Sequence, residues 1–207
     1  IRVAREAAAA AYFERNAADW DRVRALHLPE ADIDSAILAA AGAGPFDLMV
    51  DVGVGQGRMI QLFADRVRRA EGFDTSRQML AIARASLADL KAKAAVRFGD
   101  AHAPPLEAGV ADLVTIHQVL HFLSDPARAI ARAARLLKRG ARLLIIDFAP
   151  HSLEFLREEH AHRRLGFSDV DIADWCAAAG VGELKITTLA PSGRDRLTVK
   201  IWAGDKL

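Results

Sequence analysis

Three acidic residues, each close to the end of a short apolar run, have the clearest chemistry in this sequence. Asp51 lies in the run before the glycine-rich loop Gly53-Val54-Gly55-Gln56-Gly57, and Asp74 and Asp100 follow the next two runs. A carboxylate at the position of Asp51 suits a cationic amino group, and one at the position of Asp74 can accept both hydroxyls of a ribose. A carboxylate at the position of Asp100, followed by a free backbone N–H, can form hydrogen bonds with the amino edge of adenine. We therefore predict a ligand site at these three acids.

The glycine loop predicts that a ligand approaches the main chain closely. Glycine has no Cβ, so the backbone can turn tightly and leave room beside it. The dinucleotide-binding pattern is GxGxxG, whereas this loop is GxGxG and has Arg58 where the third glycine would stand. The alternative for the loop is a tight strand-to-helix turn without a ligand. The alternative for Asp74 is a carboxylate that caps the following helix.

Five short apolar runs predict the strands that position these residues. Their alternation with helical patterns is typical of a parallel doubly wound sheet. The carboxyl ends of such strands meet at one edge, where ligands bind. Ser76 is expected to cap a helix to about Leu90, and Pro126 to open a helix through Leu137 that ends at Gly140. The predicted strands are 48–52, 70–74, 95–98, 112–117 and 142–147.

The C-terminal part of the chain predicts a different arrangement. Helices are expected around 152–165 and 169–179, followed by strands at 183–189 and 197–203. The short turn region between these two strands favours an antiparallel hairpin over a crossover. The predicted fold class is therefore α/β, with a Rossmann-like sheet of seven strands flanked by helices. Five of the strands are parallel, and the last two form the C-terminal antiparallel hairpin.

Composition limits the partners of the chain. Its 207 residues carry a net charge of +1, which favours neither nucleic acid nor an acidic membrane surface. No stretch reaches the roughly 20 apolar residues of a membrane span. The single cysteine, Cys176, lies in an apolar helical pattern, so we expect a core residue and a reduced, cytoplasmic setting. Residues 1–42 are predicted to be a helical cap or linker, with a homodimer surface as one option, and residues 43–207 the ligand-binding domain.

The ordered motifs resemble those of class I S-adenosylmethionine-dependent methyltransferases, over about residues 46–150. The resemblance implies the Rossmann-like methyltransferase fold, S-adenosyl-L-methionine as cofactor and S-adenosyl-L-homocysteine as product. One departure is Ala141, which stands where the family commonly has a second glycine. The matching segments are Val50–Gly57, Gly72–Leu80, Gly99–Ala101, Asp112–Val114 followed by Val119–Leu123, and Leu137–Leu144.

The resemblance also implies a role for each predicted cofactor residue. The methionine part, the ribose, the adenosine and the sulfonium would each meet a separate group. Asp51, Gly53, Gly55 and Gly57 would contact the methionine part, and Asp74 would bind the ribose. Thr75 and Met79 would pack near the adenosine, and the adenine would be read by Gly99, Asp100 and Ala101. His117 and Gln118 would lie near the sulfonium.

Histidines are the candidate catalytic residues. In methyl transfer the cofactor supplies the reactivity and the protein supplies alignment. A general base is needed only where the acceptor must lose a proton. His117 and His121 are the predicted catalytic residues and His151 is the third candidate, with packing against the cofactor as the alternative. No metal site is predicted, because His160 and His162 are two residues apart and diverge on a helix.

A narrower resemblance concerns His117–His121 and the segment Asp147–Phe167. Both are similar to the methyltransferase-like half of bacterial ArsR-type regulators. In those proteins a winged-helix DNA-binding domain precedes this half. Because the chain starts at Ile1 without an initiator methionine or a helix cap, we expect a longer parent protein. DNA would then be a partner only through that preceding domain.

Two functions remain open on these residues. The first is an enzyme that methylates an unidentified small-molecule acceptor. The second is a non-catalytic domain that senses S-adenosylmethionine or S-adenosylhomocysteine for an ArsR-type regulator. A nicotinamide-dependent dehydrogenase is less well supported, because it lacks GxGxxG and leaves Asp51 and Asp100 unexplained.

Overall fold

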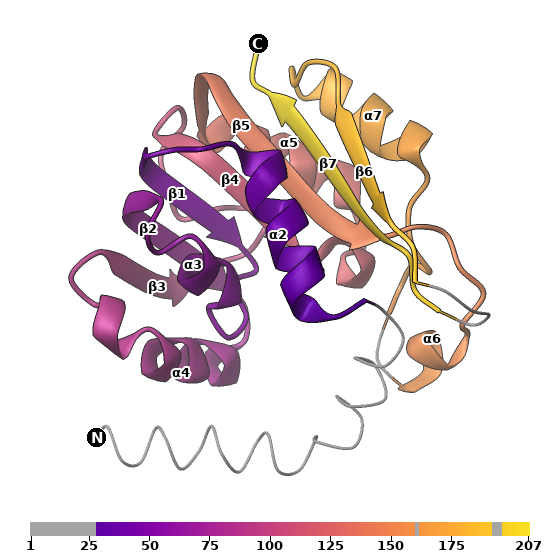
Figure 1. Cartoon of the computed structure of the whole chain (residues 1–207), viewed down its shortest axis with the longest axis horizontal. Coiled ribbons are helices and arrows are strands. Elements are labelled where there is room, and N and C mark those ends of the chain that lie inside the picture. Colours follow the sequence, from indigo (N-terminus) through magenta and orange to yellow (C-terminus); the bar gives the residue numbers. More distant parts are fainter. Residues whose placement is uncertain (1–27, 160–161, 192–195) are drawn as a thin grey trace.

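The computed structural model of the protein describes residues 28–159, 162–191 and 196–207. Residues 1–27 of the predicted N-terminal helical cap or linker lie outside this part of the chain. The described residues form one seven-stranded sheet with helices on both of its faces (Figure 1). No helix in these ranges is long and apolar enough to span a membrane.

The sheet has the predicted arrangement. Its strands are β1 (Phe46–Val52), β2 (Val67–Asp74), β3 (Ala94–Phe98), β4 (Ala111–His117), β5 (Leu137–Phe148), β6 (Lys185–Leu189) and β7 (Val199–Asp205). Their spatial order is β3-β2-β1-β4-β5-β7-β6. Strands β1 to β5 are parallel, and β7 is antiparallel to both of its neighbours. The predicted fold class is therefore confirmed.

Helices cover both faces of this sheet. They are α2 (Glu30–Ala41), α3 (Arg58–Leu62), α4 (Arg77–Ser86), α5 (Pro126–Leu136), α6 (Phe155–Glu159) and α7 (Asp169–Ala178), with 3-10 turns η1 (Ala88–Leu90) and η2 (Leu120–Phe122). Apolar side chains of α2, α3 and α4 join one hydrophobic core, and those of α5 and α7 join a second core. In β1, Met49 belongs to the first core while Val50 and Val52 belong to the second, because successive side chains of a strand alternate between faces. Burial on both faces explains the continuous apolar runs of the sequence.

Two helices begin at the residues that local chemistry indicated. The Ser76 hydroxyl accepts a hydrogen bond from the backbone N–H of Met79 (3.2 Å) and caps α4. Asp125 caps α5 in the same way through the N–H of Arg128 (3.0 Å), and Pro126 occupies the first turn. These caps satisfy N–H groups that have no partner within a helix.

Helix α5 ends earlier than the predicted position at Gly140. Leu137 already pairs with Ala111 of β4, so strand pairing begins directly after Leu136. The N–H of Gly140 donates to the carbonyl of Lys206 (2.7 Å), at the end of the chain. Pairing with remote strands has therefore replaced the last predicted turn of the helix.

Helix α6 is also shorter than the predicted 152–165. It ends at Glu159, and residues 162–168 are not helical. The N–H groups of Arg163 and Arg164 donate to the carbonyl of His121 (2.8 and 3.2 Å), and Gly166 has φ +85°. Bonds to η2 thus take the place of bonds within a helix.

Helix α2 packs directly on the sheet (Figure 1). Its Ile33 and Ile37 are buried in the same core as side chains of β5 and β7. The guanidinium of Arg142 in β5 donates to the carbonyl of Ala40 (3.0 Å) near the end of the helix. The expected boundary after Gly42 falls in the loop between α2 and β1.

Candidate functional site

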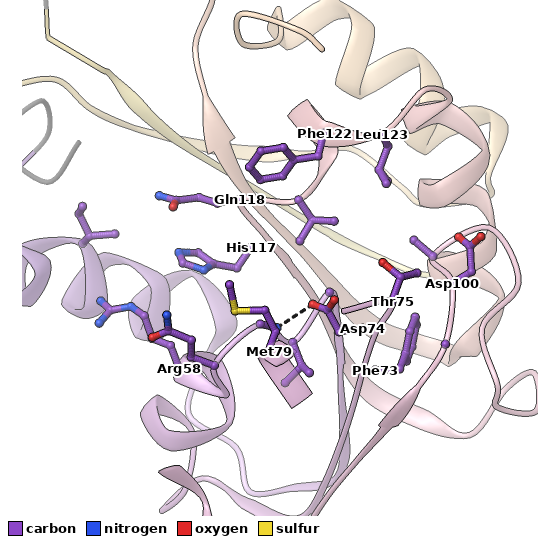
Figure 2. A pocket seen from close by; sticks show the side chains of 18 of the residues that line it. Arg58, Phe73, Asp74, Thr75, Met79, Asp100, His117, Gln118, Phe122 and Leu123 are labelled. Carbon is purple, nitrogen blue, oxygen red and sulfur yellow. Dashed lines mark hydrogen bonds between the residues drawn. The ribbon is translucent and has the colours of Figure 1, made fainter. Parts of the chain in front are cut away.

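A cavity of about 550 Å³ opens at the carboxyl ends of β1, β2, β3 and β4 (Figure 2). The strand order reverses between β1 and β4, and open α/β sheets bind ligands at that point. The volume lies within the range of about 300–1,000 Å³ for small-molecule sites. Ten of the predicted cofactor residues line the cavity: Gly53, Gly55, Asp74, Thr75, Met79, Gly99, Asp100, Ala101, His117 and Gln118.

The glycine loop follows β1 and forms part of the cavity wall. The N–H groups of Gly53 and Val54 donate to the carbonyl of Phe73 (2.9 and 3.0 Å), which ties the loop to β2. Gly53 has φ +71°, and a Cβ there would lie 2.4 Å from Cγ2 of Val119. A side chain at position 53 would therefore force Val119 or the loop to move. Gly57 has φ +89° and precedes α3, but it does not line the cavity.

Asp51 lies behind the glycine loop rather than in the cavity wall. Its side chain is buried, with 2% of the residue exposed, and its Oδ1 accepts a hydrogen bond from the Thr115 hydroxyl (2.6 Å). Burial raises the pKa of Asp51 to about 7. The charge of Asp74 also raises this pKa, whereas the hydrogen bond from Thr115 lowers it. Asp51 is thus a buried titratable group that does not line the cavity.

Asp74 lies at the end of β2, between the glycine loop and helix α4. Its Oδ2 accepts the N–H of Gly55 (3.0 Å) and its Oδ1 accepts the N–H of Ser76 (2.7 Å). A carboxylate has about four acceptor positions, so two remain for hydroxyl groups of a ligand. Thr75 and Met79 line the cavity beside it.

The turn after β3 forms the opposite end of the cavity. Asp100 is half-exposed, and its Oδ1 accepts the backbone N–H of His102 (2.8 Å) and lies 3.1 Å from Nδ1 of the same residue. These hydrogen bonds lower the pKa of Asp100, the backbone bond most. Gly99 and Ala101 line the cavity on either side of this ionised carboxylate.

His117 and Gln118 line the cavity at the end of β4. Gln118 has φ +53°, a conformation that a residue with a Cβ adopts at a cost of about 1–3 kcal/mol. Its N–H donates to the carbonyl of Ile146 (2.7 Å), which holds the strained backbone in place. In Figure 2 both side chains project into the cavity between Arg58 and Phe122. Of the two predicted catalytic histidines, His117 is the one that reaches the cavity.

His121 does not line the cavity. It is 2% exposed, and its Nδ1 lies 2.7 Å from Oδ1 of Asp147 on β5. Its ring stacks on that of His162 at a centroid distance of 4.0 Å. Burial lowers the pKa of the third candidate, His151, and the Nε2 of His151 is buried with no hydrogen-bond partner among the described residues. Of the described histidines after β4 and β5, His121 and His162 therefore pack against each other, and neither they nor His151 line the cavity.

Residues of helix α2 and the start of α3 were missed by the sequence analysis. Glu30, Ile33 and Arg58 line the cavity. The guanidinium of Arg58 lies 3.0 Å from a carboxylate oxygen of Glu30 and 2.5 Å from one of Asp34. Burial raises the pKa of Asp34, against the opposing charge of Arg58. Because Arg58 directly follows the glycine loop, its place in the sequence could have indicated a site residue. Glu30 and Ile33 of α2 reach the cavity only through tertiary packing.

Among the described residues, no group of three or more His, Cys, Asp or Glu side chains has the geometry of a metal site. His160, which the sequence analysis weighed as a ligand, lies outside the described residues. Cys176 is buried, as predicted, and burial raises the pKa of its thiol to about 12.

The comparisons with known proteins agree with this fold. Residues 50–145 match the family described as "Methyltransferase domain". The uncharacterized methyltransferase YcgJ of Bacillus subtilis is 32% identical over 49% of this chain and 41% of its own length. The uncharacterized methyltransferase Rv3342 of Mycobacterium tuberculosis is 33% identical over 67% of this chain and 53% of its own. The chain spans between a third and about half the length of the curated relatives that it matches.

Solved structures extend the comparison to the fold. The crystal structure of YcgJ has a TM-score of 0.70 with 16% identity and covers 84% of this chain and 97% of its own. Phosphoethanolamine N-methyltransferase 2 of Haemonchus contortus, solved with S-adenosyl-L-methionine, has a TM-score of 0.72 with 18% identity over 84% of this chain and 52% of its own. Residues 50–145 are therefore similar to a methyltransferase domain, and the chain shares the fold of these solved structures.

Proposed function

We propose that this domain binds S-adenosyl-L-methionine in the cavity and transfers its methyl group to a small-molecule acceptor. The observation that carries the proposal is the convergence of Gly53, Asp74, Asp100 and His117 on one cavity, although they lie at or just after the ends of four different strands. Figure 2 places Arg58 and Asp100 at opposite ends of this cavity with Asp74 between them. An extended ligand with an amino acid at one end, a ribose in the middle and a base at the other end fits this order.

The residues would hold the parts of the cofactor as follows. The Asp74 carboxylate would accept the ribose hydroxyls, and Asp100 with the N–H of Ala101 would read the adenine. Arg58 would face the α-carboxylate at the end next to the glycine loop, and ionised Asp51 would favour the ammonium group through the loop. When bound, the cofactor supplies an activated methyl group, so the protein need only align it with the acceptor.

The acceptor would enter beside η2. Val119, Phe122 and Leu123 give that part of the cavity an apolar wall, and Phe122 is 43% exposed. His117 would act as general base for an acceptor that loses a proton. His121 is not in contact with this space, so we assign it no part in proton transfer.

A second candidate function is ligand sensing, as in the resemblance to ArsR-type regulators. One observation favours it: Glu30 and Ile33 of α2 line the cavity, so a ligand there would contact the helix that follows residues 1–27. A sensor requires different affinities in two states, coupled through such a contact. DNA binding would belong to a preceding domain.

Calorimetric titration of the chain with S-adenosyl-L-methionine and then S-adenosyl-L-homocysteine tests the proposal. We expect saturable binding of both at one site. Similar affinities favour the enzyme, and a strong preference for S-adenosyl-L-homocysteine favours the sensor. The absence of binding for both compounds would overturn the proposal.

A further inference from the structure

A second hollow, of about 310 Å³, lies beside the cofactor cavity and shares no lining residue with it. The turn after β3 separates the two, since Asp100 and Ala101 line the cavity while His102 and Ala103 line the hollow. One wall is the loop from Ala103 to Ala108, and the other is helix α5. The lining residues are His102, Ala103, Pro104, Leu106, Ala108, Arg128, Arg132, Arg135 and Leu136.

Three arginines of α5 give this hollow its charge. Arg128, Arg132 and Arg135 are spaced i, i+4 and i+7, which places them along one face of the helix over about 10 Å. None of the three side chains makes an ion pair or a hydrogen bond within the described part of the chain. Arg58 and Arg142, in contrast, each pair with carboxylates. Arg128 has the Asp100 carboxylate nearby, and its charge helps to lower the pKa of Asp100. Like charges one helical turn apart repel one another, so an anion bound along the three arginines would relieve that repulsion.

His102 lies at the end of the hollow nearest Arg128. Its Nδ1 lies 3.1 Å from the carboxylate of Asp100, and its Nε2 lies 3.1 Å from the backbone carbonyl of Asp125. These contacts hold the ring between the turn after β3 and the start of α5.

The chemistry of the wall identifies the class of anion. Guanidinium groups bind phosphate oxygens through paired hydrogen bonds, and a row of three about 10 Å long suits two adjacent phosphate groups better than one. The hollow has room for on the order of ten water molecules, which limits the ligand to a small molecule.

We propose that the hollow formed by His102, Arg128, Arg132 and Arg135 binds a small molecule that carries a diphosphate group. This site is separate from the cofactor cavity and does not depend on the proposed methyltransferase function. None of the cofactor contacts proposed above involves the three arginines, although His102 hydrogen-bonds to Asp100, which lines the cofactor cavity.

Titration calorimetry of the whole chain with inorganic pyrophosphate tests this site. We expect saturable binding of one pyrophosphate per chain, weakened about tenfold by Arg132→Gln, because one charge-assisted contact is lost. Arg139→Gln is the matched control: this exposed arginine lies just beyond α5, outside the hollow, and its loss should change the affinity less than about twofold. Equal unfolding midpoints of the two variants without ligand would show that both remain folded.

Three results would overturn the site. One is the absence of saturable pyrophosphate binding, and another is an equal loss of affinity in Arg132→Gln and Arg139→Gln, which indicates general charge attraction. The third is tighter binding of a single-stranded oligonucleotide than of pyrophosphate, with the same dependence on Arg132. That result would show that the hollow binds nucleic acid and not a small molecule.

Discussion

The Nδ1 atom of His121 lies 2.7 Å from Oδ1 of Asp147, and both side chains are almost fully buried. The same carboxylate oxygen accepts the N–H of Phe148 (2.9 Å), while Oδ2 is buried and has no hydrogen-bond partner among the described residues. The carbonyl of His121 receives the N–H groups of Arg163 and Arg164. His121 therefore joins η2, β5 and the segment after α6, and this is a structural role.

The first prediction concerns this buried pair. Asp147→Asn keeps an oxygen acceptor for His121 and Phe148, but it removes the charge and places an amide NH2 donor at the buried position of Oδ2, which has no partner among the described residues. We expect a loss of about 1–3 kcal/mol in the free energy of unfolding, measured by urea denaturation. Affinity for S-adenosyl-L-homocysteine should stay within about twofold. A large drop in affinity without a loss of stability would instead place the pair in the ligand site.

The second prediction concerns the ribose contact proposed for Asp74. Asp74→Ala removes the acceptor of the ribose hydroxyls, so the dissociation constant for S-adenosyl-L-homocysteine should rise about 10- to 100-fold by calorimetry. Asp174→Ala, at an exposed position on α7, is the control and should leave the constant unchanged. Equal affinities in the two variants would contradict the role of Asp74.

The third prediction tests Arg58 as the group that faces the amino acid part of the cofactor. Arg58→Gln should weaken S-adenosyl-L-homocysteine about tenfold but leave 5′-methylthioadenosine, which lacks the amino acid part, nearly unchanged. The matched control is Arg66→Gln. Arg66 also binds the α2 region, through the carbonyls of Leu38 and Gly42, but it does not line the cavity.

The comparison between the two arginine variants separates contact from packing. If Arg66→Gln weakens S-adenosyl-L-homocysteine as much as Arg58→Gln does, the effect comes from the placement of α2. If both ligands weaken together in Arg58→Gln, the guanidinium does not select the amino acid part.

The fourth prediction is a pH dependence of stability from Asp51. Its pKa rises from 3.8 to about 7 on folding, so the folded chain binds this proton more tightly than the unfolded chain does. The stabilisation is therefore complete below the unfolded pKa and is lost as the pH rises through about 7. Between about pH 5 and 8, the unfolding free energy of the wild type should fall relative to that of Asp51→Asn. Parallel pH profiles of the two proteins in urea denaturation would rule this out.

The fifth prediction separates steric fit from backbone strain at the glycine loop. Gly53 and Gly109 have nearly the same φ, +71° and +68°. A Cβ added at Gly53 would lie 2.4 Å from the Val119 side chain, whereas a Cβ added at Gly109 would have no atom within 4 Å. Gly109→Ala should cost about 1–2 kcal/mol from strain alone. Gly53→Ala should cost more, because Val119 or the loop must move. Equal shifts of the urea midpoint would show that the cavity wall yields freely.

Local chemistry made much of the fold and half of the site predictable from sequence. The glycine loop, the Ser76 cap and Pro126 act within a few residues of where they stand, so their patterns indicated β1 and the starts of α4 and α5 correctly. The acids Asp74 and Asp100 follow consecutive parallel strands, which meet at one edge of the sheet for a general geometric reason. The sequence by itself therefore determined the sheet class, the cavity edge and ten of its lining residues.

Tertiary packing alone decided the remaining features. Only folding brings Glu30 against Arg58, 28 residues away. Asp51 is drawn under the loop by Thr115, 64 residues on, and His121 is turned away from the cavity by Asp147. His117 and His121 are four residues apart, yet only the first lines the cavity, because η2 turns the chain after Gln118. Spacing along a chain cannot show which side of such a turn faces solvent, since remote partners compete for each side chain and the bonds they form decide its direction.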